Sequence, residues 1–113
     1  VYNQYLDLGR VAYMQKVLPE ATLWTGKTIV VVHIDNNYLI PTFMENEIEV
    51  QTCIYEMGNK SLKMHQRVID KNGNIKMDSH SVLSTFDTHT KSSFLLPDEW
   101  KQKIQEFEQD NTF

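Results

Sequence analysis

Long β-type segments set the first limit on how this chain can fold. Alternating apolar and polar residues, or runs of β-branched residues, predict strands over residues 27–40, 46–56, 61–70 and 75–87. At about 10–14 residues each, these strands are roughly twice the usual length. The connections between the last three are short, and Asn72-Gly73 favours a hairpin because both residues tolerate positive φ. Short connections require antiparallel pairing, so the sequence predicts a long antiparallel sheet.

A helical pattern precedes the strands, over residues 1–17. Its apolar positions recur at intervals of three and four: Tyr2, Leu6, Gly9, Tyr13 and Val17. Gly9 costs up to about 1 kcal/mol inside a helix, so we expect it to permit close packing. Asn3, Asp7 and Arg10 are expected to form a polar stripe on another side. Pro19 ends the helix, because proline disfavours helical geometry at the preceding residue.

The last part of the chain predicts a short helix that opens after Pro97 and carries an apolar stripe of Trp100, Ile104 and Phe107. The elements together predict the α+β class and a hotdog fold, in which long antiparallel strands curl around one central helix. We expect a single domain over residues 1–113. Because the chain begins inside a helical pattern, we also expect the first strand of such a fold to lie ahead of Val1.

The composition and charge of the chain argue against some classes of partner. The chain has 113 residues, 41% of them hydrophobic, which is enough for one core, and a formal net charge of −4. No basic block predicts nucleic-acid binding, and no long apolar run predicts a membrane span. Cys53 is the only cysteine, which fits a reducing compartment. We therefore expect a soluble protein located in the cytoplasm.

Several segments, in order along the chain, carry a family resemblance. They are residues 2–10, 33–41, 43–50, 58–61 and 82–100. The first, Tyr2-Asn3-Gln4-Tyr5-Leu6-Asp7-Leu8-Gly9-Arg10, is similar to a central-helix pattern of Tyr-x-x-Tyr-x-acidic-x-small-Arg. The others are similar to a Tyr-x-x-Pro turn, an acidic turn and strand, a Gly-x-x-Ser turn, and a last strand followed by Leu-Pro-x-x-Trp. The ordered set resembles the 4-hydroxybenzoyl-CoA thioesterase-like family of acyl-CoA thioesterases.

The resemblance implies hydrolysis of an acyl-CoA thioester to a free acid and CoA, without a cofactor or a metal. It also implies a homodimer, or a tetramer built from two dimers, in which the apolar strand 29–34 pairs with its twin. In this family a motif just before the central helix supplies the catalytic aspartate. That motif would lie immediately ahead of Val1.

Asp7 is the candidate catalytic residue within the sequence. Thioester hydrolysis needs a carboxylate that orients or activates water, or attacks the carbonyl, and donors for the oxyanion. Asp7 is the only carboxylate on the predicted helix. The alternative is an ion pair with Arg10, because residues three apart are neighbours on a helix surface.

Candidate substrate contacts fall into two groups. Tyr2 and Tyr5 are expected near the acyl pocket, or else in ordinary packing. The second group suits the phosphates of CoA: Lys60, Ser61, Lys63, Arg67 and Lys91. The alternative for these residues is a solvated charged surface. The four histidines show no metal-binding spacing along the chain, and no serine lies in a nucleophile-elbow motif.

Two other functions remain open at the level of sequence. A hotdog dehydratase or hydratase would use a histidine with an acidic residue at the helix entry, and no such pair is present in residues 1–17. A non-catalytic acyl-CoA-binding domain would keep the fold and lack the base.

Overall fold

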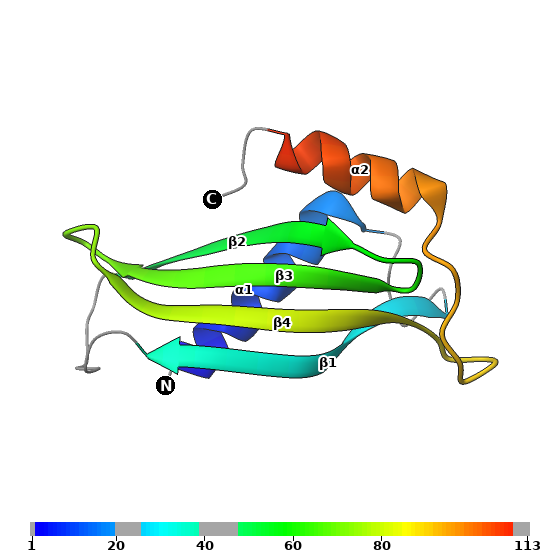
Figure 1. Ribbon diagram of the computed structural model, residues 1–113, viewed down its shortest axis with the longest axis horizontal. Coiled ribbons are helices and arrows are strands. Elements are labelled where there is room, and N and C mark those ends of the chain that lie inside the picture. The colour runs from blue at the N-terminus through cyan, green and yellow to red at the C-terminus, as the bar shows by residue number, and fades with distance from the viewer. Residues whose placement is uncertain (1, 20–25, 39–47, 110–113) are drawn as a thin grey trace.

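A computed structural model describes residues 2–19, 26–38 and 48–109, with the side chains of residues 2–4 and 38 excepted. Its elements, in chain order, are α1 (Tyr2–Val17), β1 (Lys27–Tyr38), β2 (Ile48–Met57), β3 (Ser61–Asp70), β4 (Ile75–Asp87) and α2 (Asp98–Glu108). The four strands form one antiparallel sheet in the order β1-β4-β3-β2. Figure 1 shows α1 crossing one face of this sheet, with α2 beside the β2 edge. The predicted central helix and antiparallel hotdog sheet are confirmed.

The predicted element boundaries agree closely with the structure. β3 and β4 begin and end at the expected residues, because the turns that bound them are strong local signals. β2 runs one residue further than expected, to Met57. The predicted strand residues 39, 40, 46 and 47 lie outside the described part of the chain. No helix in the described segments is long and apolar enough to cross a membrane.

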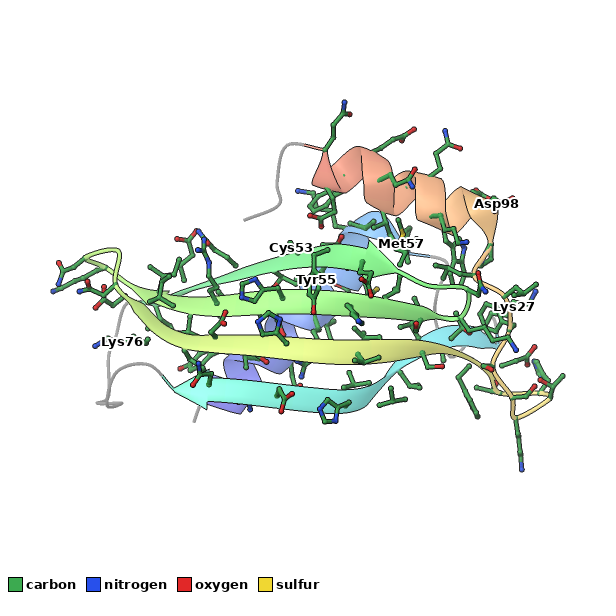
Figure 2. All side chains as sticks on the ribbon, in the orientation of Figure 1. Lys27, Cys53, Tyr55, Met57, Lys76 and Asp98 are labelled. Atoms are coloured by element: carbon green, nitrogen blue, oxygen red, sulfur yellow. The ribbon has the colours of Figure 1, made fainter. Side chains whose placement is uncertain are left out.

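The core lies between the sheet and the two helices. Figure 2 draws the side chains on the ribbon, seen from the face of the sheet opposite α1. Buried side chains of the sheet face α1, among them Leu62, Met64, Val68, Met77 and Leu83. They pack against Leu6, Tyr13 and Val17 of α1 and against Trp100 and Ile104 of α2. Each large apolar side chain removed from water contributes about 1.5–3 kcal/mol. The apolar stripes predicted for both helices therefore hold them to the sheet.

Gly9 lies where α1 crosses closest to the sheet. A Cβ atom at this position would lie 3.0 Å from Gln66 Nε2, 3.0 Å from Val50 Cγ1 and 3.1 Å from Thr52 Oγ1. Real Cβ atoms seldom have neighbours this close, so a side chain would push the helix away from β2 and β3. The expectation that Gly9 permits close packing is confirmed.

The expected polar stripe on α1 was wrong for Arg10. This side chain is buried, at 9% exposure, whereas Asp7 is exposed at 69%. Arg10 lies one residue after Gly9, on the side of the helix that meets the sheet, where Nη1 donates to Gln66 Oε1 at 2.9 Å. A buried guanidinium requires such acceptors, and no periodicity along the helix could show that the sheet supplies one.

Apolar residues on both faces of residues 29–34 predict a strand that is covered on both sides, but in the single chain β1 is largely exposed. Within the described residues β1 pairs with β4 alone and ends the sheet. Its apolar side chains are 37–58% exposed: Val30, Val31, Val32 and Ile34. The pairing with β4 shifts register between Val31 and His33, so Val32 forms a bulge. The predicted cover on both faces of β1 is therefore absent among the described residues.

Candidate active site

A groove between α1 and β1 is the best candidate for a binding site. Its volume is about 430 Å³. The lining residues come from α1 and the turn after it, from β1 and from β4: Asp7, Arg10, Val11, Met14, Gln15, Leu18, Pro19, Thr28, Ile29, Val31 and Leu83. Most of these side chains are apolar, and the charged ones are Asp7 and Arg10. Apolar grooves with a few convergent polar groups are typical ligand sites.

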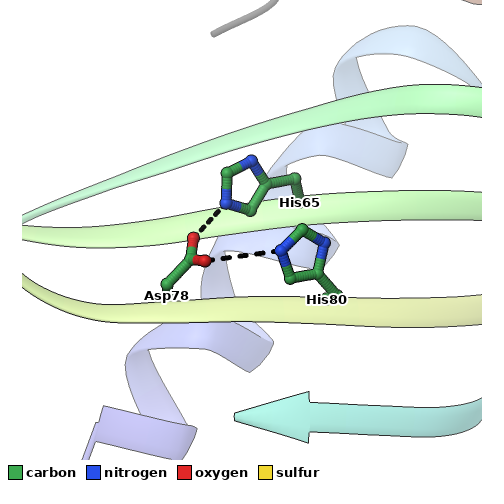
Figure 3. Close-up of side chains that lie close together, drawn as sticks. All are labelled: His65, Asp78 and His80. Atoms are coloured by element: carbon green, nitrogen blue, oxygen red, sulfur yellow. Dashed lines mark hydrogen bonds and ion pairs between the residues drawn. The ribbon is translucent and has the colours of Figure 1, made fainter. Parts of the chain in front are cut away.

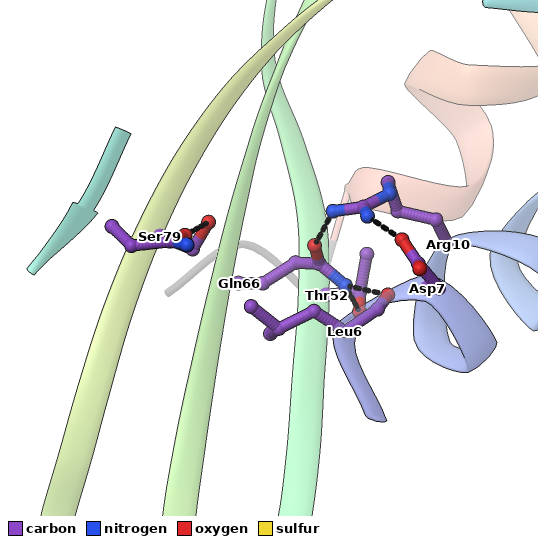
Figure 4. Close-up of polar contacts among 7 residues, drawn as sticks. Leu6, Asp7, Arg10, Thr52, Gln66 and Ser79 are labelled. Carbon is purple, nitrogen blue, oxygen red and sulfur yellow. Dashed lines mark hydrogen bonds and ion pairs between the residues drawn. The ribbon is translucent and has the colours of Figure 1, made fainter. Parts of the chain in front are cut away.

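A hydrogen-bond network anchors the charged part of the groove to the sheet (Figure 4). Arg10 Nη2 donates to Asp7 Oδ1, and Arg10 Nη1 donates to Gln66 Oε1. Gln66 Nε2 donates to the Leu6 carbonyl oxygen at 2.9 Å and to Thr52 Oγ1 at 3.2 Å. The exposed carboxylate of Asp7 is thus held by a guanidinium that also donates to Gln66 of β3. The ion pair expected from the spacing of Asp7 and Arg10 is present.

Three of the expected CoA contacts lie at one end of the sheet. Lys60 lies in the turn between β2 and β3, Ser61 is the first residue of β3, and Lys91 lies in the turn that follows β4. The Lys60 carbonyl oxygen accepts a hydrogen bond from the Thr85 N–H at 3.0 Å, which ties the β2–β3 turn to the end of β4. β1 begins at this same end, where Thr28 lines the groove.

Lys63 and Arg67 lie on the other face of the sheet. They alternate along β3 with the buried residues that face α1, so their side chains point away from the groove. Lys63 Nζ lies 2.8 Å from Glu56 Oε2, and Arg67 donates to Gln51 Oε1. Tyr5 lies on α1 with an exposed side chain. The side chain of Tyr2 lies outside the described part of the structure.

The sequence analysis did not identify the buried Gln66 or the pair formed by His65 and His80. Gln66 is fully buried on the inner face of β3, between Met64 and Val68. A glutamine in an otherwise apolar alternation was the available signal. His65 and His80 are register partners across β3 and β4. Counting back from the Asn72-Gly73 hairpin would have paired them, whereas their separation along the chain shows nothing.

The comparisons with known proteins agree with this architecture. The sequence model of the thioesterase-like superfamily matches residues 1–104, and the chain belongs to that superfamily. No curated protein matches the chain in sequence. The family resemblance seen in the sequence is therefore confirmed by the family model.

Solved structures of similar fold include three thioesterases. One is a thioesterase from Thermus thermophilus complexed with coenzyme A and Zn, at 23% identity and TM-score 0.82, covering 98% of this chain and 80% of that one. A predicted thioesterase from Bacillus stearothermophilus has 21% identity and TM-score 0.80, covering 92% and 77%. The DHNA-CoA thioesterase from Staphylococcus aureus has 16% identity and TM-score 0.79, covering 99% and 80%. At these identities the likeness establishes the fold.

Proposed function

We propose that this protein is an acyl-CoA thioesterase that releases a free acid and CoA. The observation that carries the proposal is the apolar groove between α1 and β1, with Asp7 in its wall, in a chain of the thioesterase-like superfamily. The similar structures from S. aureus and T. thermophilus are a DHNA-CoA thioesterase and a thioesterase complexed with coenzyme A. These neighbours support a CoA thioester as the substrate. No cofactor and no metal takes part in the proposed reaction.

In the proposed reaction, the groove binds the acyl group and Asp7 is the candidate to act on the attacking water. The apolar part, which includes Met14 and Leu83, takes the acyl group and removes it from water. Water then attacks the thioester carbonyl, the C–S bond breaks, and the CoA thiol leaves. A carboxylate is needed to orient or activate that water. Among the described residues that line the groove, Asp7 is the only carboxylate.

Release of CoA from a panel of short, long and aromatic acyl-CoA substrates tests the proposal directly. Turnover of at least one class, with the free acid as product, supports a thioesterase. Tight binding of acyl-CoA without turnover would instead make the chain a non-catalytic acyl-CoA-binding domain. A hydratase would consume an enoyl-CoA substrate without releasing the thiol, so the same assay separates this third function.

Asp7→Asn separates the two roles of Asp7. If Asp7 only pairs with Arg10, turnover should fall by less than about tenfold, because the carboxylate then takes no part in the chemical step. The measurement is kcat on the best substrate of the panel, with the melting temperature as the control for folding. Loss of a catalytic base would cost about 100-fold to 10,000-fold. A collapse of that size in a folded variant would assign the base to Asp7 and reject the simple ion pair.

The CoA moiety is proposed to bind where the β2–β3 turn and the turn after β4 meet. Lys60, Ser61 and Lys91 lie at that end of the sheet, next to the start of β1. Lysine ammonium groups suit phosphates as point charges. The positions of Lys63 and Arg67 on the other face favour their ordinary role in polar pairing. Tyr5, and Tyr2 before it on α1, stay as proposed contacts of the acyl end.

Lys60→Ala with Lys91→Ala should raise the KM for acyl-CoA roughly five- to thirtyfold, because each lost phosphate contact costs about 0.5–1 kcal/mol. The KM for a short acyl thioester that lacks the nucleotide should not change. Lys71→Ala in the β3–β4 turn, at the opposite end of the sheet, is the matched control. An equal rise for both substrates would reject phosphate binding by these lysines.

The assembly proposed for the protein is a homodimer through the outer edge of β1, with a dimer of dimers as the larger form. Support comes from the exposed apolar side chains of β1 and from an exposed stripe of Tyr5, Leu8 and Val11 on α1. An apolar edge strand with no cover is an aggregation hazard, which pairing with a second copy removes. We propose that this assembly is located in the cytoplasm and that residues 1–113 form one domain.

A further inference from the structure

We propose that His65, Asp78 and His80 bind one divalent transition-metal ion, with Zn²⁺ as the best match, on the face of the sheet opposite α1 (Figure 3). His65 on β3 and His80 on β4 are register partners, and their rings stack with centroids 4.4 Å apart and planes 5° apart. Asp78 lies two residues before His80, so its carboxylate shares that face. One ligand atom from each residue lies within 4.8 Å of the others.

The three ligands fit zinc in type and in spacing. Two imidazole nitrogens and one carboxylate oxygen are common zinc ligands, and water can complete a tetrahedral site. Bonds of about 2.0–2.2 Å place tetrahedral ligand atoms about 3.3–3.6 Å apart. His80 Nε2 already lies 3.4 Å from Asp78 Oδ2, and His65 Nε2 contacts the other oxygen of the same carboxylate. Small side-chain rotations therefore admit the ion, with the strands unchanged.

The surroundings hold the two rings in place. The Tyr55 ring meets both edge-on, with centroids 6.5 Å from His65 and 5.8 Å from His80. His65 and Asp78 are largely shielded, with 18% and 25% of their side chains exposed, while His80 is about half exposed. Metal binding therefore removes little water from His65 and Asp78. The exposed side near His80 leaves room for water as the remaining ligand.

Neighbouring charges set the expected affinity. Arg67 is the register partner of Asp78, and its positive charge opposes a cation. Asp35 is the register partner of His80, and its negative charge favours one. Lys63, further along β3, is paired with Glu56. The charges of Arg67 and Asp35 therefore offset one another in part.

The sheet separates this site from the groove. His65 and His80 point away from α1, whereas the groove lies between α1 and β1. A bound ion would link β3 to β4 and stabilise the sheet without touching the thioester. The inference therefore stands independently of the proposed thioesterase activity.

Calorimetric titration of the full chain, free of any histidine tag, with ZnCl₂ tests the site. We expect one ion per chain. His80→Ala and Asp78→Asn should each weaken binding by at least about tenfold. His33→Ala is the matched control, because His33 is an exposed histidine of the same sheet, next to Asp35 and outside the cluster. Its affinity should stay within about twofold of the wild type.

Thermal melting provides a second readout that a weakly folded variant cannot imitate. Zn²⁺ at about 100-fold excess over its dissociation constant should raise the melting temperature by several degrees in the wild type and in His33→Ala. In His80→Ala, binding that is tenfold weaker should reduce this rise to about half or less. The His80 side chain is about half exposed, so we expect this variant to fold. Absence of binding at millimolar ZnCl₂, or equal losses in His33→Ala and His80→Ala, would overturn the proposal.

Discussion

Replacing Val32 and Ile34 with lysine should convert the proposed dimer into monomers and lower acyl-CoA turnover by about 100-fold. Both side chains lie on the edge strand β1 and are 58% and 42% exposed, so the fold of the single chain should survive. In a dimer that pairs β1 with its twin, the four new charges would face one another across the axis. Natural sheet edges use lysine in this way to prevent pairing.

The loss of turnover follows from the position of the groove. Val31 of β1 forms part of its lining, and the groove lies along the edge that the second copy would cover. Without that copy the groove is open to water, and the thioester loses a fixed position relative to Asp7. Small displacements of reacting groups cost about two orders of magnitude in rate.

Molecular mass from light scattering and CoA release are the two measurements. Leu95→Lys is the matched control, because Leu95 is 68% exposed and lies after β4, away from β1. It should leave both mass and turnover unchanged. Monomers of the β1 variant with full turnover would show that the groove is complete in one chain. A persistent dimer would place the interface on another surface.

Glu108→Ala should lower the free energy of unfolding by about 2–4 kcal/mol. Glu108 lies at the end of α2, is buried, and its Oε1 accepts from the Tyr13 hydroxyl and from the Ile54 N–H at 3.2 Å. Burial and the hydrogen bond to Glu108 raise the pKa of Tyr13 well above its ordinary value. Removing the carboxylate leaves both donors buried without this acceptor, and the contact that joins α1, β2 and α2 is lost.

Urea or thermal unfolding measures the effect, and a loss in this range should lower the melting temperature by roughly 10 °C or more. Glu108→Gln is the control, because its amide oxygen can accept the same two hydrogen bonds. It should cost about 1 kcal/mol or less. A change below about 0.5 kcal/mol in Glu108→Ala would mean that the two donors find other partners. It would reject Glu108 as the contact that joins α1, β2 and α2.

Much of the fold could be predicted because its signals are local. The Asn72-Gly73 turn and the alternation on either side of it define β3 and β4, and Pro19 and Pro97 bound the two helices. Side-chain period and turn chemistry act over a few residues, so one sequence is enough to find them. The same holds for Gly9, whose helix position without a side chain predicted the close approach to the sheet.

The candidate site was predicted less completely. Asp7 and Arg10 were recognised as a pair because residues three apart on a helix are neighbours. The burial of Arg10 was missed, since it depends on Gln66, which lies 56 residues away. Lys63 and Arg67 were grouped with Lys60, yet the alternation of β3 places them on the far face. Residues that lie close together along a strand do not necessarily point to the same face of the sheet.

The amino-acid sequence by itself determined the elements, their order, the antiparallel hairpins and the membership of the thioesterase-like superfamily. Only the tertiary structure decided which residues meet: the groove between α1 and β1, the buried Arg10–Gln66 contact, and the pair of His65 and His80. The physical reason is the distance along the chain over which each interaction acts. Backbone preferences depend on immediate neighbours, whereas strand register and the rotation of a helix on a sheet depend on packing over the whole core.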